Sequence, residues 1–188
     1  MTRDDLHRIL EEHVPADAKE AADQAAMLHF LTDLSDPLSA TQETAHFTAS
    51  ALVVDEPRAR TCLVLHRKLA LWLQPGGHVE AADPSIASAA LREVREETGL
   101  AARLDGETPV HLDVHEIPER PDMPAHLHLD VRFLVVATGD ELTLSDESTD
   151  VRWWPLDDAS GAGDESLSRL IRAAIQRRST RFSSPQSD

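Results

Sequence analysis

The residues from Arg92 to Gly99 read Arg-Glu-Val-Arg-Glu-Glu-Thr-Gly and carry three glutamates at helical spacing. If the segment is helical, Glu93, Glu96 and Glu97 occupy positions i, i+3 and i+4, so their carboxylates share one face. Like charges placed this way repel by roughly 0.2–0.5 kcal/mol per pair, which a folded domain tolerates when a cation binds there. Because the ligands are carboxylate oxygens, the spacing predicts a site for a hard divalent cation, Mg²⁺ or Mn²⁺.

The context of these glutamates favours a metal site over a merely solvated acidic helix face, which is the ordinary alternative. A short loop separates Gly76–Gly77 from Asp83–Pro84. The Asp-Pro pair predicts the start of a helix, with Asp83 as the N-cap acceptor and Pro84 at the first helical position. Gly99 is typical of the position just past a helix end. Arg92 precedes Glu96 by four residues, so we expect the arginine to hold that carboxylate in position.

The same helix carries an apolar stripe by which it can pack on a sheet. Ala87, Leu91, Val94 and Thr98 recur at i, i+4, i+7 and i+11. At about 100° per residue, this stripe lies roughly 120° from the glutamate face. We therefore expect one side of the helix to be buried and another side to present carboxylates to a cleft.

The elements around this helix change from helical to strand patterns along the chain. Helical spacing predicts helices over residues 3–14, 17–34 and 164–178. β-branched and apolar runs predict strands over residues 47–54, 61–66, 110–115, 126–137 and 151–154. This order predicts an α/β (α+β) fold with a mixed sheet. We expect a helical extension over residues 1–40, a core domain over 41–180 and a disordered tail over 181–188.

Composition and charge limit the classes of function. The 188 residues include 18 basic and 34 acidic side chains, and the net charge is −16. This charge repels phosphate backbones and argues against general nucleic-acid binding, although a small phosphorylated substrate can bind through a metal ion. Cys62 is the only cysteine, which excludes a disulfide framework and a cysteine-based zinc site. Without a signal peptide or a long apolar run, we expect a cytoplasmic protein with no membrane partner.

The segment from Gly77 to Leu100 resembles the Nudix box, the signature of the Nudix hydrolases. The usual pattern is Gly, five residues, Glu, seven residues, and then Arg-Glu-aliphatic-x-Glu-Glu-x-Gly-aliphatic. The run from Arg92 to Leu100 fits the second half throughout. In the first half, Asp83 stands where glutamate is usual, and eight residues rather than seven separate it from Arg92. The resemblance extends over roughly His46 to Asp158.

This resemblance implies a Nudix-type α/β/α sandwich, with the two N-terminal helices outside the common core. It implies an Mg²⁺- or Mn²⁺-dependent hydrolase that cleaves a diphosphate linkage in a nucleoside diphosphate linked to another moiety. In this chain Glu93, Glu96 and Glu97 would bind the metal, with the carbonyl of Gly77 as a further ligand, and Arg92 would orient a glutamate. The alternative is a catalytically silent Nudix-fold protein that binds nucleotides or acts as a regulator.

The resemblance leaves the general base, the substrate and the assembly open. Glu97 is the first candidate for the base, and Glu141, Glu147 and Asp150 from later loops are further candidates. Sugar nucleotides, dinucleotide cofactors, oxidised nucleoside triphosphates and simple nucleotides are all candidate substrates. The N-terminal helices would serve as a packing addition or as the surface of a homodimer.

A second group of polar residues alternates along the predicted strand 126–137. His126, His128, Asp130 and Arg132 fall on one face of that strand, and His115 ends a similar alternation in the preceding strand. One interpretation is the solvent-facing side of an antiparallel sheet. A second is a polar wall of the substrate pocket, and a third is a transition-metal site formed by His126, His128 and Asp130.

Overall fold

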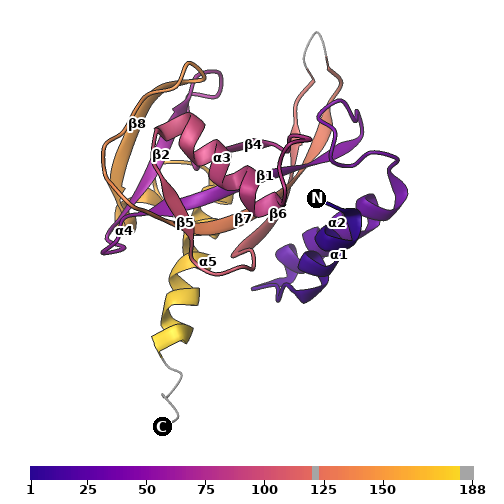
Figure 1. Cartoon of the computed structure of the whole chain (residues 1–188), viewed down its shortest axis with the longest axis horizontal. Helices are drawn as coiled ribbons and strands as arrows, with labels where there is room; N and C mark the ends of the chain where they lie inside the picture. The colour runs from indigo at the N-terminus through magenta and orange to yellow at the C-terminus, as the bar shows by residue number, and fades with distance from the viewer. Residues whose placement is uncertain (120–122, 183–188) are drawn as a thin grey trace.

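An eight-stranded mixed sheet is the framework of the fold in the computed structural model, which describes residues 1–119 and 123–182 (Figure 1). The strands are β1 (Ala45–Val54), β2 (Arg60–His66), β3 (Trp72–Leu73), β4 (Gly76–His78), β5 (Ala102–Leu104), β6 (His111–Ile117), β7 (His126–Ala137) and β8 (Ser148–Pro155). The helices are α1 (Arg3–Glu12), α2 (Ala18–Asp33), α3 (Ile86–Thr98), α4 (Leu156–Ala159) and α5 (Glu165–Phe182).

The long strands β1 and β7 run parallel at the centre of the sheet. Their register pairs Ala45 with Leu127 and continues without a break to Val54 with Val136. The main path of the sheet is β3-β2-β1-β7-β5, and β4, β6 and β8 pair antiparallel with β1, β7 and β2 respectively. Two strands pair antiparallel with β1 at different places along it. The strand β2 pairs with Val53–Val54, and β4 pairs with Thr48–Ser50. The small strand β4 therefore holds its glycines against the middle of β1.

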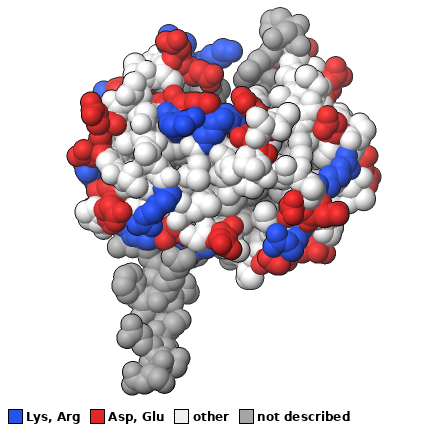
Figure 2. Space-filling model, in the orientation of Figure 1, with Lys and Arg blue, Asp and Glu red and all other residues white. Residues whose placement is uncertain are grey.

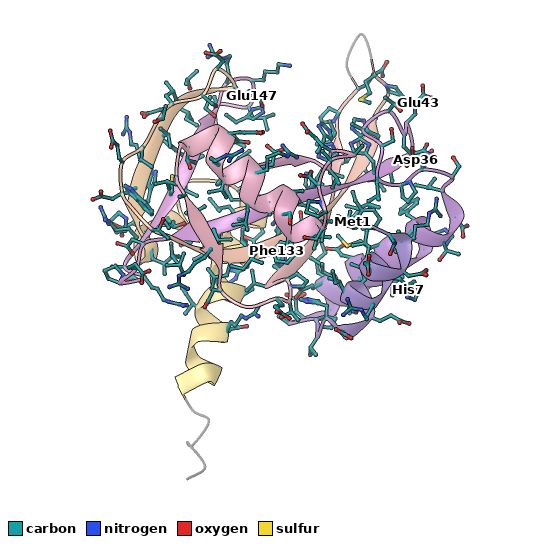
Figure 3. All side chains as sticks on the ribbon, in the orientation of Figure 1. Met1, His7, Asp36, Glu43, Phe133 and Glu147 are labelled. Carbon is teal, nitrogen blue, oxygen red and sulfur yellow. The ribbon has the colours of Figure 1, made fainter. Side chains whose placement is uncertain are left out.

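The two faces of β1 and β7 have different partners because successive side chains point to opposite faces. The odd-numbered residues, such as Phe47 and Phe133, are apolar and form one core with α3, and Figure 3 shows Phe133 at the centre of the molecule. The even-numbered residues are apolar only at the carboxyl ends of the strands, where Leu52 and Leu134 pack with residues of α4 and α5. The amino-terminal half of the even-numbered face is polar and is not covered by the apolar residues of α5.

The N-terminal helices share the core of the sheet. Leu6 and Leu10 of α1 and Met27 and Leu31 of α2 are buried in the same apolar cluster as residues of β1 and β7. The buried carboxylate of Glu20 accepts a hydrogen bond from the backbone N–H of Leu112 in β6, at 2.9 Å. Figure 1 shows α1 and α2 side by side next to β6. The division of the chain into an extension and a core domain stays a prediction.

The predicted helices and strands are confirmed with small shifts of their ends. The pair Gly76–Gly77 belongs to the short strand β4, which is not among the predicted strands. Of the predicted disordered tail 181–188, residues 181 and 182 belong to α5, and residues 183–188 lie outside the described residues, so the tail stays a prediction. In the described ranges no helix has both the length and the apolar character needed to cross a membrane.

Candidate active site at the edge of β4

The helix α3, which carries the three glutamates, begins two residues later than the sequence predicts. Its N-cap is Ser85, whose hydroxyl accepts a hydrogen bond from the N–H of Ser88, and Asp83 is therefore not the cap. At the other end Gly99 has a left-handed conformation with φ of 74°, as expected for a residue that ends a helix. The Asp83 side chain is free for another role because a serine caps the helix.

The glutamates lie closer to the buried side of α3 than the predicted apolar stripe suggests. Buried Ile86, Ala89 and Ala90 place the packed face on the side of Glu93 and Glu97, whereas Ala87 and Leu91 are only partly buried. The predicted separation of about 120° between the packed and acidic faces is therefore wrong. The reason is that small alanines allow close packing on the sheet, so the two glutamates point into the space beside β4.

Burial and neighbouring negative charge change the ionisation of the two inner glutamates. Burial, together with the charges of Glu93 and Glu147 and against one opposing backbone hydrogen bond, raises the pKa of Glu97 to about 8. Burial also raises the pKa of the Glu93 carboxyl, although Arg92 opposes this shift. The side chain of Glu96 is 50% exposed. The three carboxylates therefore extend from the protein interior to solvent.

The glycines of β4 allow the backbone to lie directly against these side chains. A Cβ atom on Gly76 would lie 2.2 Å from the Cβ of Ser50, and one on Gly77 would lie 2.8 Å from the Glu93 carboxylate. The N–H of Gly76 donates to Glu97 at 3.3 Å. Neither glycine has a positive φ, so glycine is needed here for close approach rather than for an unusual backbone conformation.

Arg92 connects the first half of the motif to the second. Its guanidinium donates to Glu93 at 2.7 Å and to Glu96 at 2.9 Å. It also donates to both carboxylate oxygens of Asp83, at 3.2 and 3.0 Å, and to the carbonyl of His78 at 2.8 Å. The hydrogen bond with Asp83 and the charge of the glutamates raise the pKa of Arg92 above its usual range. Arg92 is thus fixed between Asp83 and two of the glutamates.

A cavity of about 190 Å³ lies beside β4, on the uncovered part of the sheet. Its walls include Gly76 and Gly77 as well as Ser50, His128 and Asp130. His115 of β6, paired with His128 in the register of the two strands, also lines it. The two glycines therefore line the cavity on one side and contact glutamates of α3 on the other.

A family model for the NUDIX domain matches residues 44–174, which is well over half of the chain. The chain belongs to the NUDIX family. A NUDIX-family hydrolase from Clostridium perfringens is 24% identical with a TM-score of 0.57, and the match covers 70% of this chain and 97% of that one. The MutT protein from Methanosarcina mazei Go1 gives 20% identity and a TM-score of 0.58, over 74% and 99% of the two chains.

A third structure is the NUDIX domain of Shewanella oneidensis NrtR, solved with ADP-ribose, at 20% identity and a TM-score of 0.53. That match covers 80% of this chain and 97% of the other. No curated protein matches the chain. These neighbours confirm the predicted α/β/α NUDIX fold, and the family match begins after α1 and α2.

Asp130 and Arg132 belong to a buried charge network behind the cavity of this NUDIX fold. Asp130 accepts hydrogen bonds from Ser50 at 2.8 Å and from Arg132 at 2.7 Å, and Arg132 also donates to Asp113 at 3.0 Å. Although burial opposes ionisation, His115 and Arg132 hold the pKa of Asp113 well below its usual range. With Asp130 and Arg132 at 3% and 1% exposure, the solvent-facing interpretation of this strand is wrong. Arg132 contacts buried carboxylates and does not line the cavity.

His126 does not line the cavity either, because it is buried among other histidines. Its Nδ1 atom lies 2.9 Å from the carbonyl oxygen of Pro124, and its ring stacks on that of His46 at 5.0 Å. His46 and His78 form a compact group with His128 that sequence reasoning did not find. The signal was one histidine just before the predicted strand 47–54 and another just after the glycine pair, but only the strand register shows that the two lie together.

The three loop acids that were candidates for the base have different surroundings, and Glu141 is exposed. The charge of Glu147 acts on both Glu93 and Glu97, and Figure 3 shows it at the end of the molecule where α3 ends. Asp150 instead pairs with Arg152 on β8. Figure 2 shows acidic side chains spread over this face, with a mixed basic and acidic patch over α3. Glu147 is therefore the loop acid whose charge reaches the two inner glutamates.

Proposed function

We propose that this chain is an Mg²⁺- or Mn²⁺-dependent hydrolase that cleaves a diphosphate linkage in a nucleoside diphosphate linked to another moiety. The observation that carries the proposal is the meeting of Glu93, Glu97 and Gly76–Gly77 at the edge of a cavity. Membership of the NUDIX family supports the class of reaction. The nearly intact box supports an active enzyme over a silent one, because its second half keeps every carboxylate.

The ligands at this site suit a hard divalent cation. Glu93, Glu96 and Glu97 supply carboxylate oxygens, and the half-exposed Glu96 leaves space for water and substrate phosphate, as Mg²⁺ prefers. The missing side chain at Gly77 brings the backbone next to Glu93, where the Gly77 carbonyl would be a further ligand. A cation would also offset the repulsion among carboxylates that raises the pKa of Glu97.

The residues of the chain would then have separate tasks. A bound cation supplies charge that eases attack of water on a diphosphate phosphorus. Arg92 would hold Glu93 and Glu96 in position, and Glu97 or Glu147 would accept the proton of the attacking water. His128 and Asp130, with His115, would contact the part of the substrate that lies in the cavity. Arg132 and His126 lie behind the cavity and would not contact the substrate directly. Arg132 would hold the Asp130 carboxylate in place.

The first test is an activity screen with Mg²⁺ or Mn²⁺ over a panel of diphosphate compounds. ADP-ribose leads the panel because the similar Shewanella domain was solved with it, and sugar nucleotides, dinucleotide cofactors and nucleoside triphosphates follow. We expect hydrolysis of at least one compound that depends on the metal. Thermal stabilisation by a nucleotide without hydrolysis of any compound would instead support the alternative, a silent NUDIX-fold binding protein.

The variant Glu97→Gln should lose the metal-dependent activity while the fold is kept. Glutamine keeps the size of the side chain but removes the negative charge and the capacity to accept a proton, so we expect a loss of roughly 100-fold or more in kcat. The melting temperature should not fall, because a neutral amide is easier to bury than a carboxylate. The matched control is Glu107→Gln at an exposed position, and equal turnover of the two variants would contradict the assignment of Glu97.

A further inference from the structure

Three histidines from three strands meet on the polar half of the sheet. His46 of β1 and His128 of β7 are paired in the parallel register, so their side chains lie next to each other on one face. His78 of β4 pairs opposite Thr48, two residues along β1 from His46, which places it diagonally on the same face. The ring centroids are 4.8, 5.0 and 5.4 Å apart, and the nitrogen atoms that can bind metal lie within 4.8 Å of one another.

A hydrogen bond to the backbone fixes the tautomer of one ring of this group. Nδ1 of His46 lies 3.1 Å from the carbonyl oxygen of Gln42 and must donate to it, so Nε2 of the neutral ring carries a lone pair. This Nε2 atom and that of His128 are buried and have no hydrogen-bond partner among the described residues. A backbone carbonyl that fixes the tautomer of a histidine is the usual support of a metal ligand.

We propose that His46, His78 and His128 bind a divalent transition metal ion, of which Zn²⁺ is the representative, at a site distinct from the carboxylates of α3. Imidazole nitrogen suits Zn²⁺, whereas carboxylate and carbonyl oxygen suit Mg²⁺, so the two sites differ in ligand chemistry. Burial lowers the pKa of His46 and of His128, the latter to about 2, which keeps both rings in the neutral form that binds metal. His78 is exposed and opens the site to solvent.

The geometry needs only a small adjustment to accept the ion. At Zn–N distances of about 2.0–2.1 Å, tetrahedral ligands lie roughly 3.3 Å apart, so each nitrogen has to move by about 1 Å from its present position. Three protein ligands leave a fourth position for water or for an oxygen of a bound molecule. The set differs from the one predicted from sequence, because Asp130 is hydrogen-bonded to Thr48, Ser50 and Arg132 instead.

The test is binding of Zn²⁺ to the full chain, with any histidine tag removed, in competition with a chromophoric chelator. We expect one equivalent of Zn²⁺ to bind, and Co²⁺ to give the visible absorption of a nitrogen-ligated site. His78→Ala should weaken binding by about 10-fold or more, since loss of even a supporting residue costs that much. His78 is exposed, so this variant should fold, and His128→Gln is the second variant for the same loss.

Three matched controls decide where the metal binds. His126→Gln removes a neighbouring ring that is outside the proposed set, His29→Gln removes an exposed histidine of α2, and Glu97→Gln changes the carboxylate site. We expect all three variants to bind Zn²⁺ like the wild type. Equal binding by His78→Ala and the wild type overturns the proposal, and so does a loss of binding in Glu97→Gln or His126→Gln. Because the readout is Zn²⁺ binding and not hydrolysis, the zinc-site proposal can fail while the hydrolase function holds. Likewise, the hydrolase function can fail while the zinc-site proposal holds.

Discussion

Asp83 shows how a departure from a family motif can keep its chemistry. The aspartate is one methylene shorter than the usual glutamate, and one extra residue separates it from Arg92. It is buried and accepts two hydrogen bonds from Arg92 and one from the backbone N–H of Glu80, the last at 2.8 Å. The shorter side chain and the longer spacing thus still bring a carboxylate to the arginine that holds Glu93 and Glu96.

We expect Asp83→Ala to weaken activation by Mg²⁺ more than it weakens the fold. Without Asp83 the guanidinium of Arg92 loses its anchor, so Glu93 and Glu96 are held less firmly. Losing a supporting partner of this kind costs about 10–100-fold in metal affinity. The measurement is the Mg²⁺ concentration that gives half-maximal hydrolysis, alongside the melting temperature and the KM for substrate.

The control for this positioning role is Asp105→Ala, at a similarly buried aspartate. Asp105 accepts a hydrogen bond from Arg58 at 2.6 Å. Its loss should lower stability without changing the Mg²⁺ requirement. If both variants change the Mg²⁺ requirement equally, Asp83 has only a structural role.

Among the elements, β4 depends most on the absence of side chains. It lies against β1, and a methyl group on Gly76 would overlap both the side chain and the backbone of Ser50. Moving β4 outward would also separate the N–H of Gly76 from Glu97. The strand therefore couples the packing of the sheet to the position of a glutamate in the candidate active site.

Gly76→Ala should consequently destabilise the fold and reduce activity together. Overpacking of this kind costs about 1–3 kcal/mol, which is measurable by urea denaturation. The matched control is Gly139→Ala, because a Cβ at Gly139 would meet nothing within 4 Å. If the two variants have the same free energy of unfolding, then β4 can shift away from Ser50 without loss of stability, and the prediction is wrong.

Most elements could be predicted from the sequence because their patterns are local. Alternation along residues 126–137 was enough to predict β7 and the shared face of His126, His128 and Asp130. The contacts of that face could not be predicted. They depend on the register of β7 with β1 and on how much of the sheet α5 packs against. Likewise the glutamate spacing predicted a shared face on α3, but only the packed structure shows Glu93 and Glu97 turned toward β4.

At the scale of the whole molecule, the polar half of the sheet holds an unusual number of buried ionisable groups. Arg132 donates hydrogen bonds to both Asp130 and Asp113 behind the cavity. His111 of β6 is paired with Arg132 in the register and is 2% exposed, and neither of its ring nitrogens has a hydrogen-bond partner among the described residues. Such a buried histidine makes the stability of the protein depend on pH.

We expect His111→Phe to make the stability of the protein less sensitive to acid between about pH 6.5 and 4. Burial, helped by the charge of Arg132, lowers the pKa of His111 from 6.5 to about 4, so in this range the unfolded chain binds a proton that the folded protein does not. Stability is therefore lost as pH falls through this range, by up to about 1.4 kcal/mol per pH unit. Urea denaturation of both proteins at several pH values measures the slope, with His29→Phe at an exposed position as the control. Parallel slopes for the wild type and His111→Phe would show that His111 is not the source of the pH dependence.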